Sequence, residues 1–295
     1  MIVDITGGAV LGCDDLGDPQ NPGVILIGGL ATQRTVWPDT LCVDLVHAGF
    51  RVIRFDNRDM GESTWSAAPT GPDLVRMIQE GLGPNDELAY TLHDLADDVV
   101  ALMDALGVPT AHIVGMSMGG RIAQSVALRY PDRTASLVSM MSTTGNPDLP
   151  PPTPEAMTSL MTPPSDPYDV DAVTELAQAQ QRVIGSPGYA MPDDYVRDVV
   201  ALNFRRGNNP EGVMRQWLAS VSAGDWRDRL SSLNTPTLIL HGRDDPLVRF
   251  AAGEDCARTI PGAALRLIDG WGHNIPPAIG PLLAQELATF FNATN

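Results

Sequence analysis

The chain has 295 residues, of which 43% are hydrophobic and 19% charged, as is typical of a globular protein with one large domain or two modest ones. Its 19 basic and 36 acidic residues give a formal net charge of −17, which argues against nucleic acid or an anionic membrane surface as the main partner. All 19 basic residues are arginine. The lack of lysine excludes Schiff-base enzymes, pyridoxal-phosphate enzymes and Walker-type phosphate loops.

The three cysteines, Cys13, Cys42 and Cys256, are widely spaced and odd in number. They predict free thiols in a reducing compartment rather than a disulfide framework or a zinc site. The N-terminal residues show no basic region followed by an apolar stretch, and the longest apolar runs are only strand-sized. We therefore expect a cytoplasmic protein without stable membrane association.

Short apolar runs alternate with helical patterns along most of the chain. The runs that predict strands buried on both faces are residues 24–27, 51–55, 111–114, 137–141, 237–240 and 264–268. Helical periodicity covers residues 37–48, 92–106, 122–130 and 282–291, and it is clearest in the second of these. This alternation predicts an α/β fold with a doubly wound, mostly parallel sheet.

The alternation stops between residues 143 and 226. This stretch contains a proline-rich run, residues 150–154, and helical patterns, but no convincing strand. We expect it to form a helical cap or lid inserted into a core made of residues 1–142 and 227–295.

A candidate nucleophile lies between a predicted strand and a predicted helix. Residues 115–119 read Gly-Met-Ser-Met-Gly and fit the pattern G-x-S-x-G, which places Ser117 on the turn. A sharp turn there would raise the hydroxyl above the sheet edge, and the flanking glycines would avoid crowding. The alternative is a glycine-rich turn whose serine only caps the following helix.

A serine nucleophile needs a base and an orienting acid. Of the five histidines, His273 follows the last predicted strand in a glycine-rich loop, whereas the other four are expected on the surface, in a strand or supporting a loop. The acid candidates are Asp244 and Asp245, which follow the strand at 237–240. Ser117, Asp245 and His273 then each follow a strand, at the carboxyl edge where open α/β sheets place ligands.

The reaction would also need donors for a developing oxyanion. The Gly28-Gly29 turn after the first long strand offers backbone N–H groups, and the N–H of Met118 is the second candidate donor. The same glycines would also suit a tight turn without a catalytic role.

Taken together, these motifs resemble the α/β-hydrolase fold superfamily over nearly the whole chain. Residues 56–63 resemble its D-x-R-x-x-G-x-S loop, residues 115–119 its nucleophile elbow, residues 242–245 its G-x-x-D acid motif and residues 272–273 its Gly-His. The acid motif favours Asp245 over Asp244. Ile27 stands where the family often has histidine before the oxyanion turn. More narrowly, the chain is similar to LipG-like esterases and to anthracycline methyl esterases.

The resemblance implies acyl transfer by a serine esterase with Ser117 as nucleophile, His273 as base and Asp245 as the acid that orients it. Gly29 and Met118 would supply the oxyanion hole, and no metal or organic cofactor would be needed. The partner would be a small-molecule ester, and the protein a monomer or homodimer. A serine at the elbow argues against haloalkane dehalogenases and epoxide hydrolases, which have aspartate there.

Adaptable apolar side chains around the serine would suit small to medium apolar esters. The candidate substrate-binding residues are Leu30, Met116, Met157, Met161, Trp217 and Trp271. Ordinary packing of the cap would explain the same residues equally well. The alternatives are a methyl esterase of a polycyclic metabolite, a lactonase, a perhydrolase, a carbon–carbon bond hydrolase on the same triad, and a non-catalytic ligand receptor.

Overall fold

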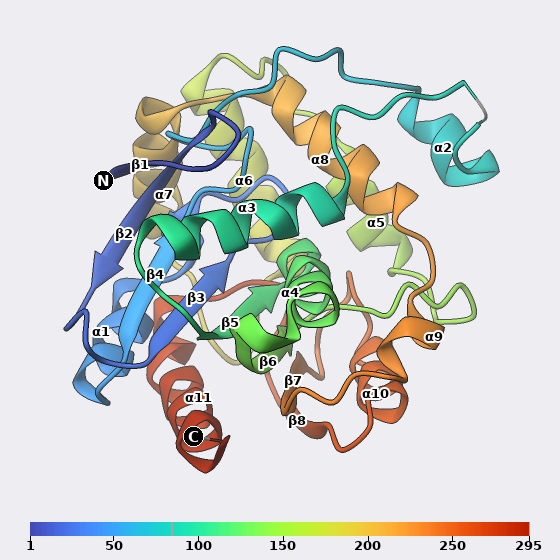
Figure 1. The fold of residues 1–295 in the computed structure, drawn as a ribbon. Helices are drawn as coiled ribbons and strands as arrows, with labels where there is room; N and C mark the ends of the chain where they lie inside the picture. The colour runs from blue at the N-terminus through green and yellow to red at the C-terminus, as the bar shows by residue number, and fades with distance from the viewer. Residues whose placement is uncertain (84, 295) are drawn as a thin grey trace.

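The computed structural model describes residues 1–83 and 85–294, and these build an eight-stranded sheet flanked by helices (Figure 1). In chain order the strands are β1 (Ile2–Asp4), β2 (Val10–Leu16), β3 (Gly23–Ile27), β4 (Arg51–Phe55), β5 (Ala111–Met116), β6 (Thr134–Met140), β7 (Thr237–Gly242) and β8 (Ala264–Ile268). Their order in the sheet is β1-β2-β4-β3-β5-β6-β7-β8. The pairs from β4 to β8 are all parallel, which confirms the predicted α/β class with a mostly parallel sheet.

Helices cover both faces of the sheet (Figure 1). They are α1 (Asp39–His47), α2 (Leu74–Glu80), α3 (Leu92–Ala105), α4 (Met118–Arg129), α5 (Pro154–Met161), α6 (Val170–Ile184), α7 (Asp193–Arg206), α8 (Pro210–Ser222), α9 (Arg227–Leu230), α10 (Ala251–Thr259) and α11 (Gly280–Thr294). Three short 3₁₀ turns are η1 (Arg34–Val36), η2 (Pro131–Arg133) and η3 (Pro277–Ile279). The predicted helices at 37–48, 92–106, 122–130 and 282–291 correspond to α1, α3, α4 and α11.

Alternate side chains of the central strands fill two separate cores. In β3, Ile25 and Ile27 pack into the core that α3 and α4 cover, whereas Val24 and Leu26 pack into the core that α1 and α11 cover. All four side chains are fully buried. A strand buried on both faces reads as a continuous apolar run, which is why the sequence marked these strands clearly.

The two N-terminal strands were missed by the sequence prediction. β1 and β2 pair antiparallel with each other, and β2 pairs antiparallel with β4. β2 carries Asp14 and Asp15, whose carboxylates pair with Arg54 and Arg51 of β4. These charges interrupt the apolar run, so the strand shows no buried pattern in the sequence.

The chain between β6 and β7, which the structure describes throughout, contains α5 to α9 and no strand. Helices α5 to α8 lie toward the carboxyl ends of the parallel strands (Figure 1). No helix in the described part of the chain is long and apolar enough to cross a bilayer.

Candidate functional site

Ser117 occupies a sharp turn between β5 and α4. Its φ of +54° lies in the left-handed region, and a Cβ added to Gly119 would come within 2.3 Å of the carbonyl oxygen of Ile27. The Ser117 N–H donates to the Met140 carbonyl at 2.8 Å, and its own carbonyl accepts from the Ser142 hydroxyl at 2.8 Å. The backbone of Ser117 is therefore fixed through both its N–H and its carbonyl. Glycine is required at position 119 because the backbone there lies against that of Ile27.

The Ser117 hydroxyl makes no hydrogen bond that would cap α4, so the structure does not support the capping alternative. Its Oγ instead lies 3.1 Å from Nε2 of His273. Nδ1 of His273 lies 2.7 Å from Oδ2 of Asp245, which is almost fully buried. The structure thus brings the three predicted residues into one hydrogen-bonded chain, although they are far apart in sequence.

Asp245 is oriented by the loop that follows β7. Its Oδ1 accepts hydrogen bonds from the N–H groups of Leu247 and Val248, at 2.9 and 2.8 Å. The other oxygen is thereby aimed at His273. Asp244, the alternative acid, accepts from the N–H of Gly270 at 2.7 Å and has a role in the loop instead.

None of the other four histidines contacts Ser117 in the described structure. His112 lies on β5 and stacks on Phe291 with ring centroids 4.1 Å apart, and His93 stacks on Trp226. His47 is exposed at the end of α1. His241 is fully buried near the site, with Nε2 2.7 Å from the carbonyl oxygen of Val248 and 3.7 Å from Oδ2 of Asp245.

Backbone N–H groups without a hydrogen-bond partner lie in the two turns next to Ser117. A Cβ added to Gly29 would lie 3.2 Å from Cβ and 3.8 Å from Oγ of Ser117, so the turn after β3 passes directly beside the serine. Within the described residues, the N–H groups of Gly29, Leu30 and Met118 have no hydrogen-bond partner. Met118 is the first residue of α4, where an N–H has no partner inside the helix and the helix dipole favours negative charge.

The six candidate substrate-binding residues lie in different surroundings. Leu30 follows Gly29 in the oxyanion turn, and Met116 precedes Ser117. Met161 and Trp217 pack around Leu218 in a small apolar cluster between α2, α5 and α8. Met157 is 38% exposed on α5. Trp271 is fully buried and donates its indole N–H to the carbonyl of Asn274 at 2.7 Å, next to His273.

The segment after α6 holds the histidine loop, a contact that the sequence did not predict. The His273 N–H donates to the carbonyl of Ile184 at 2.7 Å. The hydroxyl of Ser186 accepts from the N–H of Gly272 at 3.0 Å and donates to the side chain of Asn274 at 2.5 Å. The amide of Asn274 in turn donates to Gln181 of α6 at 2.6 Å.

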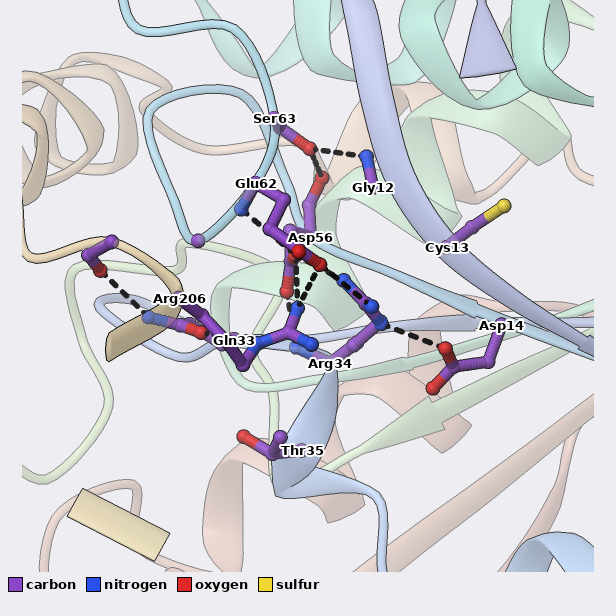
Figure 2. A network of polar contacts seen from close by, with 12 residues as sticks. Gly12, Cys13, Asp14, Gln33, Arg34, Thr35, Asp56, Glu62, Ser63 and Arg206 are labelled. Carbon is purple, nitrogen blue, oxygen red and sulfur yellow. Dashed lines mark hydrogen bonds and ion pairs between the residues drawn. The ribbon is translucent and has the colours of Figure 1, made fainter. Parts of the chain in front are cut away.

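A second polar cluster joins α7 to the core (Figure 2). The fully buried carboxylate of Asp56 accepts from Nη1 of Arg34 and from Nη2 of Arg206, both at 2.6 Å. Arg34 also pairs with Asp14 and Glu62. Burial of Arg34 opposes its charge, but these carboxylates outweigh that effect and raise its pKa above the ordinary value. The guanidinium of Arg206 is therefore occupied by its ion pair with Asp56.

The residues that the structure describes contain no group of three or more His, Cys, Asp or Glu side chains placed to hold a metal ion. Ser117, His273 and Asp245 thus place a hydroxyl, an imidazole and an oriented carboxylate in one hydrogen-bonded row, which is the set of groups that nucleophilic catalysis by serine uses. Backbone N–H groups without a partner in the described part of the chain, such as those of Gly29 and Met118, are the kind of donor that stabilises an oxyanion.

Comparison with known proteins identifies the family to which this fold belongs. Residues 22–277 match the family model described as alpha/beta hydrolase fold. Rhodomycin D methylesterase DnrP of Streptomyces peucetius is 28% identical to the chain, over 96% of the chain and 95% of that protein. A 2-hydroxy-6-oxononadienedioate/2-hydroxy-6-oxononatrienedioate hydrolase of Burkholderia vietnamiensis is 31% identical over 70% of the chain and 72% of that protein.

Among solved structures, the 2-hydroxy-6-oxo-6-phenylhexa-2,4-dienoate hydrolase of Rhodococcus sp. strain RHA1 superposes with a TM-score of 0.74. It is 22% identical, and the match covers 99% of each chain, so this likeness bears on the fold alone.

Proposed function

The chain belongs to the alpha/beta hydrolase fold family, and on that premise we propose that it is a carboxylic ester hydrolase with Ser117 as its nucleophile. The observation that carries this proposal is the hydrogen-bonded chain from Ser117 through His273 to Asp245. Relatives named as esterases match the chain over nearly its whole length, which supports the same class. The substrate is then a small molecule that carries an ester.

In the proposed reaction, His273 removes the hydroxyl proton of Ser117 as Oγ attacks the ester carbonyl. This requires a neutral imidazole with its proton on Nδ1, and the contact with Asp245 selects that tautomer. Once the imidazole is charged, the carboxylate of Asp245 stabilises it. His273 then protonates the leaving alcohol, and an acyl group remains on Ser117.

The negative charge of the tetrahedral intermediate would be met by backbone N–H groups. We assign this role to Gly29 and Met118, whose N–H groups lie beside the serine without other partners in the described structure. The unpartnered N–H of Leu30 adjoins the same turn. Water then attacks the acyl-enzyme with His273 as base, so that no step calls for a metal or an organic cofactor.

We further propose that residues 143–226 act as the cap over this site and that residues 1–142 and 227–295 form the hydrolase core. Leu30 and Met116 are the chain neighbours of Gly29 and Ser117, and apolar residues at these positions are the basis for expecting small to medium apolar esters. Met157, Met161, Trp217 and Trp271 stay predictions as substrate-binding residues. The cytoplasmic location and the monomeric or homodimeric state stay predictions as well.

A second candidate is a methyl esterase that acts on a polycyclic metabolite. It is favoured by the similarity to rhodomycin D methylesterase, which spans 96% of the chain. Both candidates use the same chemistry and differ only in which side of the ester is large.

The test is hydrolysis of p-nitrophenyl esters from acetate to laurate by the wild type and by Ser117→Ala. We expect the variant to lose about a million-fold in kcat, because no other group replaces the nucleophile. Ser125→Ala is the matched control, since Ser125 is a buried serine of the same helix that contacts His93. Hydrolysis that survives in Ser117→Ala would refute the proposal.

A fluorophosphonate probe and two further substrates separate the alternatives. Covalent labelling of the wild type but not of Ser117→Ala shows an activated serine, and absence of labelling would favour a non-catalytic receptor. Turnover of a polycyclic methyl ester well above that of the nitrophenyl esters would select the methyl esterase. Turnover confined to a 2-hydroxy-6-oxodienoate would select a carbon–carbon bond hydrolase.

A further inference from the structure

We propose that Gln216, on α8 of the proposed cap, is a positioning residue that holds the oxyanion turn in its catalytic shape. This inference rests on the proposed function, because it concerns the turn whose N–H groups would stabilise the oxyanion. It gives Gln216 itself a role in the reaction, whereas the rest of α8 serves to carry this side chain.

The contacts of Gln216 connect α8 with two loops of the core. Its side chain is fully buried. Its Oε1 accepts the N–H of Ala31 at 3.1 Å, and its Nε2 donates to the carbonyl oxygen of Arg58 at 3.0 Å. Both ends of the amide are therefore used, and neither loop could move without leaving a buried polar group unpaired.

The oxyanion turn depends on such support because its backbone is strained. Ala31 has a φ of +59°, in the left-handed region that residues with a Cβ seldom adopt. Such a conformation persists only where the surroundings hold it. Ala31 stands two residues after Gly29, so its relaxation would shift the N–H groups of the turn that passes beside Ser117.

The other side of the turn is held from within the core. The Gly28 carbonyl accepts from the side chain of Asn57 at 3.0 Å, and the Gly29 carbonyl accepts from the hydroxyl of Thr32 at 3.0 Å. At Ala31, among the described residues, the hydrogen bond to the N–H comes from α8. Gln216 therefore supplies support at the strained end of the turn, where the core supplies no partner for the N–H.

Helix α8 is itself firmly seated. Nε and Nη2 of Arg215 donate to the two carboxylate oxygens of Asp59 at 2.9 and 3.0 Å. The side chain of Asn209, which caps α8, donates to the carbonyl oxygen of Asp59 at 3.1 Å. The guanidinium of Arg215 and the hydroxyl of Tyr90 outweigh the burial of Asp59 and keep the pKa of its carboxyl below the ordinary value. The neighbour of Gln216 thus anchors the helix that carries it.

This arrangement predicts a distinctive kinetic effect. Donors to the oxyanion matter in the transition state and hardly at all in substrate binding, so misplacing them lowers kcat with little change in KM. A residue that only stabilised the fold would lower the amount of active enzyme without this pattern.

The experiment compares Gln216→Met with the wild type on the best p-nitrophenyl ester. Methionine keeps the side-chain length and removes both hydrogen bonds. We expect kcat to fall by about 10- to 100-fold, since a misplacement of about 1 Å costs on that order, with KM changed less than about twofold. We also expect the inhibition constant of a trifluoromethyl ketone, which forms an oxyanion on the serine, to rise by the same factor as kcat/KM falls.

Asn209→Ala is the matched control. It removes the cap of α8 and its hydrogen bonds to Asp59, but it leaves the contact between Gln216 and Ala31. We expect it to lower the melting temperature and to leave kcat within about twofold of the wild type. Equal losses of kcat in Asn209→Ala and Gln216→Met would overturn the inference and assign Gln216 a role in the docking of α8 alone.

A second variant covers the case in which Gln216→Met does not fold. Gln216→Glu keeps an oxygen that accepts the Ala31 N–H and gives up the donor to Arg58, so we expect its kcat to fall by less than about 10-fold from the wild type. Slow hydrogen exchange of the Ala31 N–H in the wild type and in Gln216→Glu would support the hydrogen bond between Ala31 and the side chain at position 216. Fast exchange at Ala31 in the wild type would refute it.

The outcomes also separate the inference from the proposed function. If the wild type hydrolyses esters and Gln216→Met does so at the same kcat, the inference fails and the proposed function stands. If the wild type hydrolyses no ester and takes up no fluorophosphonate, the proposed function fails and the inference falls with it.

Discussion

At Ser117 the backbone is held in a conformation that serine seldom adopts, and the strain is balanced by bonds from Met140 and Ser142. Asp245 is likewise fixed by its own loop, and His273 by the carbonyl of Ile184 at the end of α6. At the scale of single residues, the site is therefore preorganised by backbone hydrogen bonds that do not depend on a substrate. Burial of a titratable side chain near the site, that of His241, also makes the stability of the fold depend on pH.

His241 predicts how stability depends on pH. Its imidazole is fully buried, and burial lowers its pKa from the ordinary value of 6.5. As the pH falls below about 6.5, the unfolded state takes up a proton that the folded state does not bind, so the free energy of unfolding decreases. His241→Asn should therefore show a smaller loss of stability between pH 7.5 and 5 than the wild type.

Urea unfolding at several pH values measures the slope of the free energy of unfolding against pH. His93 also has a lowered pKa from burial and a nearby Arg229, so the slope should shrink without vanishing. His47→Asn is the control, because an exposed imidazole is solvated in both states. An unchanged slope in His241→Asn would show that its protonation does not differ between the folded and unfolded states.

At the scale of elements, the helices between β6 and β7 are connected to the core by buried polar contacts. Arg206 of α7 contacts Asp56, Gln216 of α8 contacts the turn after β3, and Ser186 after α6 contacts the loop that carries His273. These contacts indicate that α6, α7 and α8 are fixed against the core rather than loosely attached to it.

The cluster around Asp56 should matter greatly for stability (Figure 2). Asp56→Ala leaves the buried guanidinium of Arg34 without its main partner, so we expect a loss of about 3–5 kcal/mol in the free energy of unfolding. Arg206→Met leaves the pair between Asp56 and Arg34 intact and should cost less. Arg182→Met, which breaks an exposed pair with Asp193, should cost at most about 1 kcal/mol.

Urea or guanidinium unfolding of the three variants checks this order. A cost for Arg206→Met equal to that for Asp56→Ala would show that α7, and not Arg34, supplies the main partner of the carboxylate.

Ser186 gives a second prediction at this scale. Ser186→Ala removes the acceptor for the Gly272 N–H and the donor to Asn274, which loosens the loop that carries His273. We expect kcat for ester hydrolysis to fall by roughly 10-fold, because small displacements of a general base are costly. Ser222→Ala, whose hydroxyl bonds only within α8, should retain the wild-type kcat. Equal activity in the two variants would contradict the prediction.

At the scale of the whole molecule, the net charge of −17 is the dominant feature. Arginines such as Arg58, Arg129 and Arg133 are already paired with aspartates. Because acidic residues outnumber basic ones by 36 to 19, acidic side chains remain without a basic partner and repel one another. We expect the melting temperature near pH 7.5 to rise between 20 and 200 mM salt, because the Debye length shortens from about 20 Å to below 10 Å over such a range.

Calorimetry in sodium chloride and in choline chloride measures this effect. The two salts should act alike, because screening depends on ionic strength and not on the cation. A melting temperature that falls with salt would show that the ion pairs outweigh the overall repulsion.

The sequence by itself determined the α/β class, the parallel strands and the order of the candidate catalytic residues along the chain. These features leave local signals, because doubly buried strands read as apolar runs and the loops after them as glycine-rich segments. The antiparallel strands β1 and β2 left no such signal, because β1 has only three residues, two of them exposed, and Asp14 and Asp15 break the apolar pattern of β2.

Only the tertiary structure decided which distant groups hold the site in place. The resemblance to the acid motif favoured Asp245 over Asp244, and the structure adds the physical reason: the carboxylate of Asp245 contacts His273, whereas that of Asp244 accepts from the N–H of Gly270. Gln216 and Ala31 are 185 residues apart, and Ser186 and Gly272 are 86 apart. A hydrogen bond between groups so far apart imposes no periodicity or spacing on the chain, so folding alone brings these partners together.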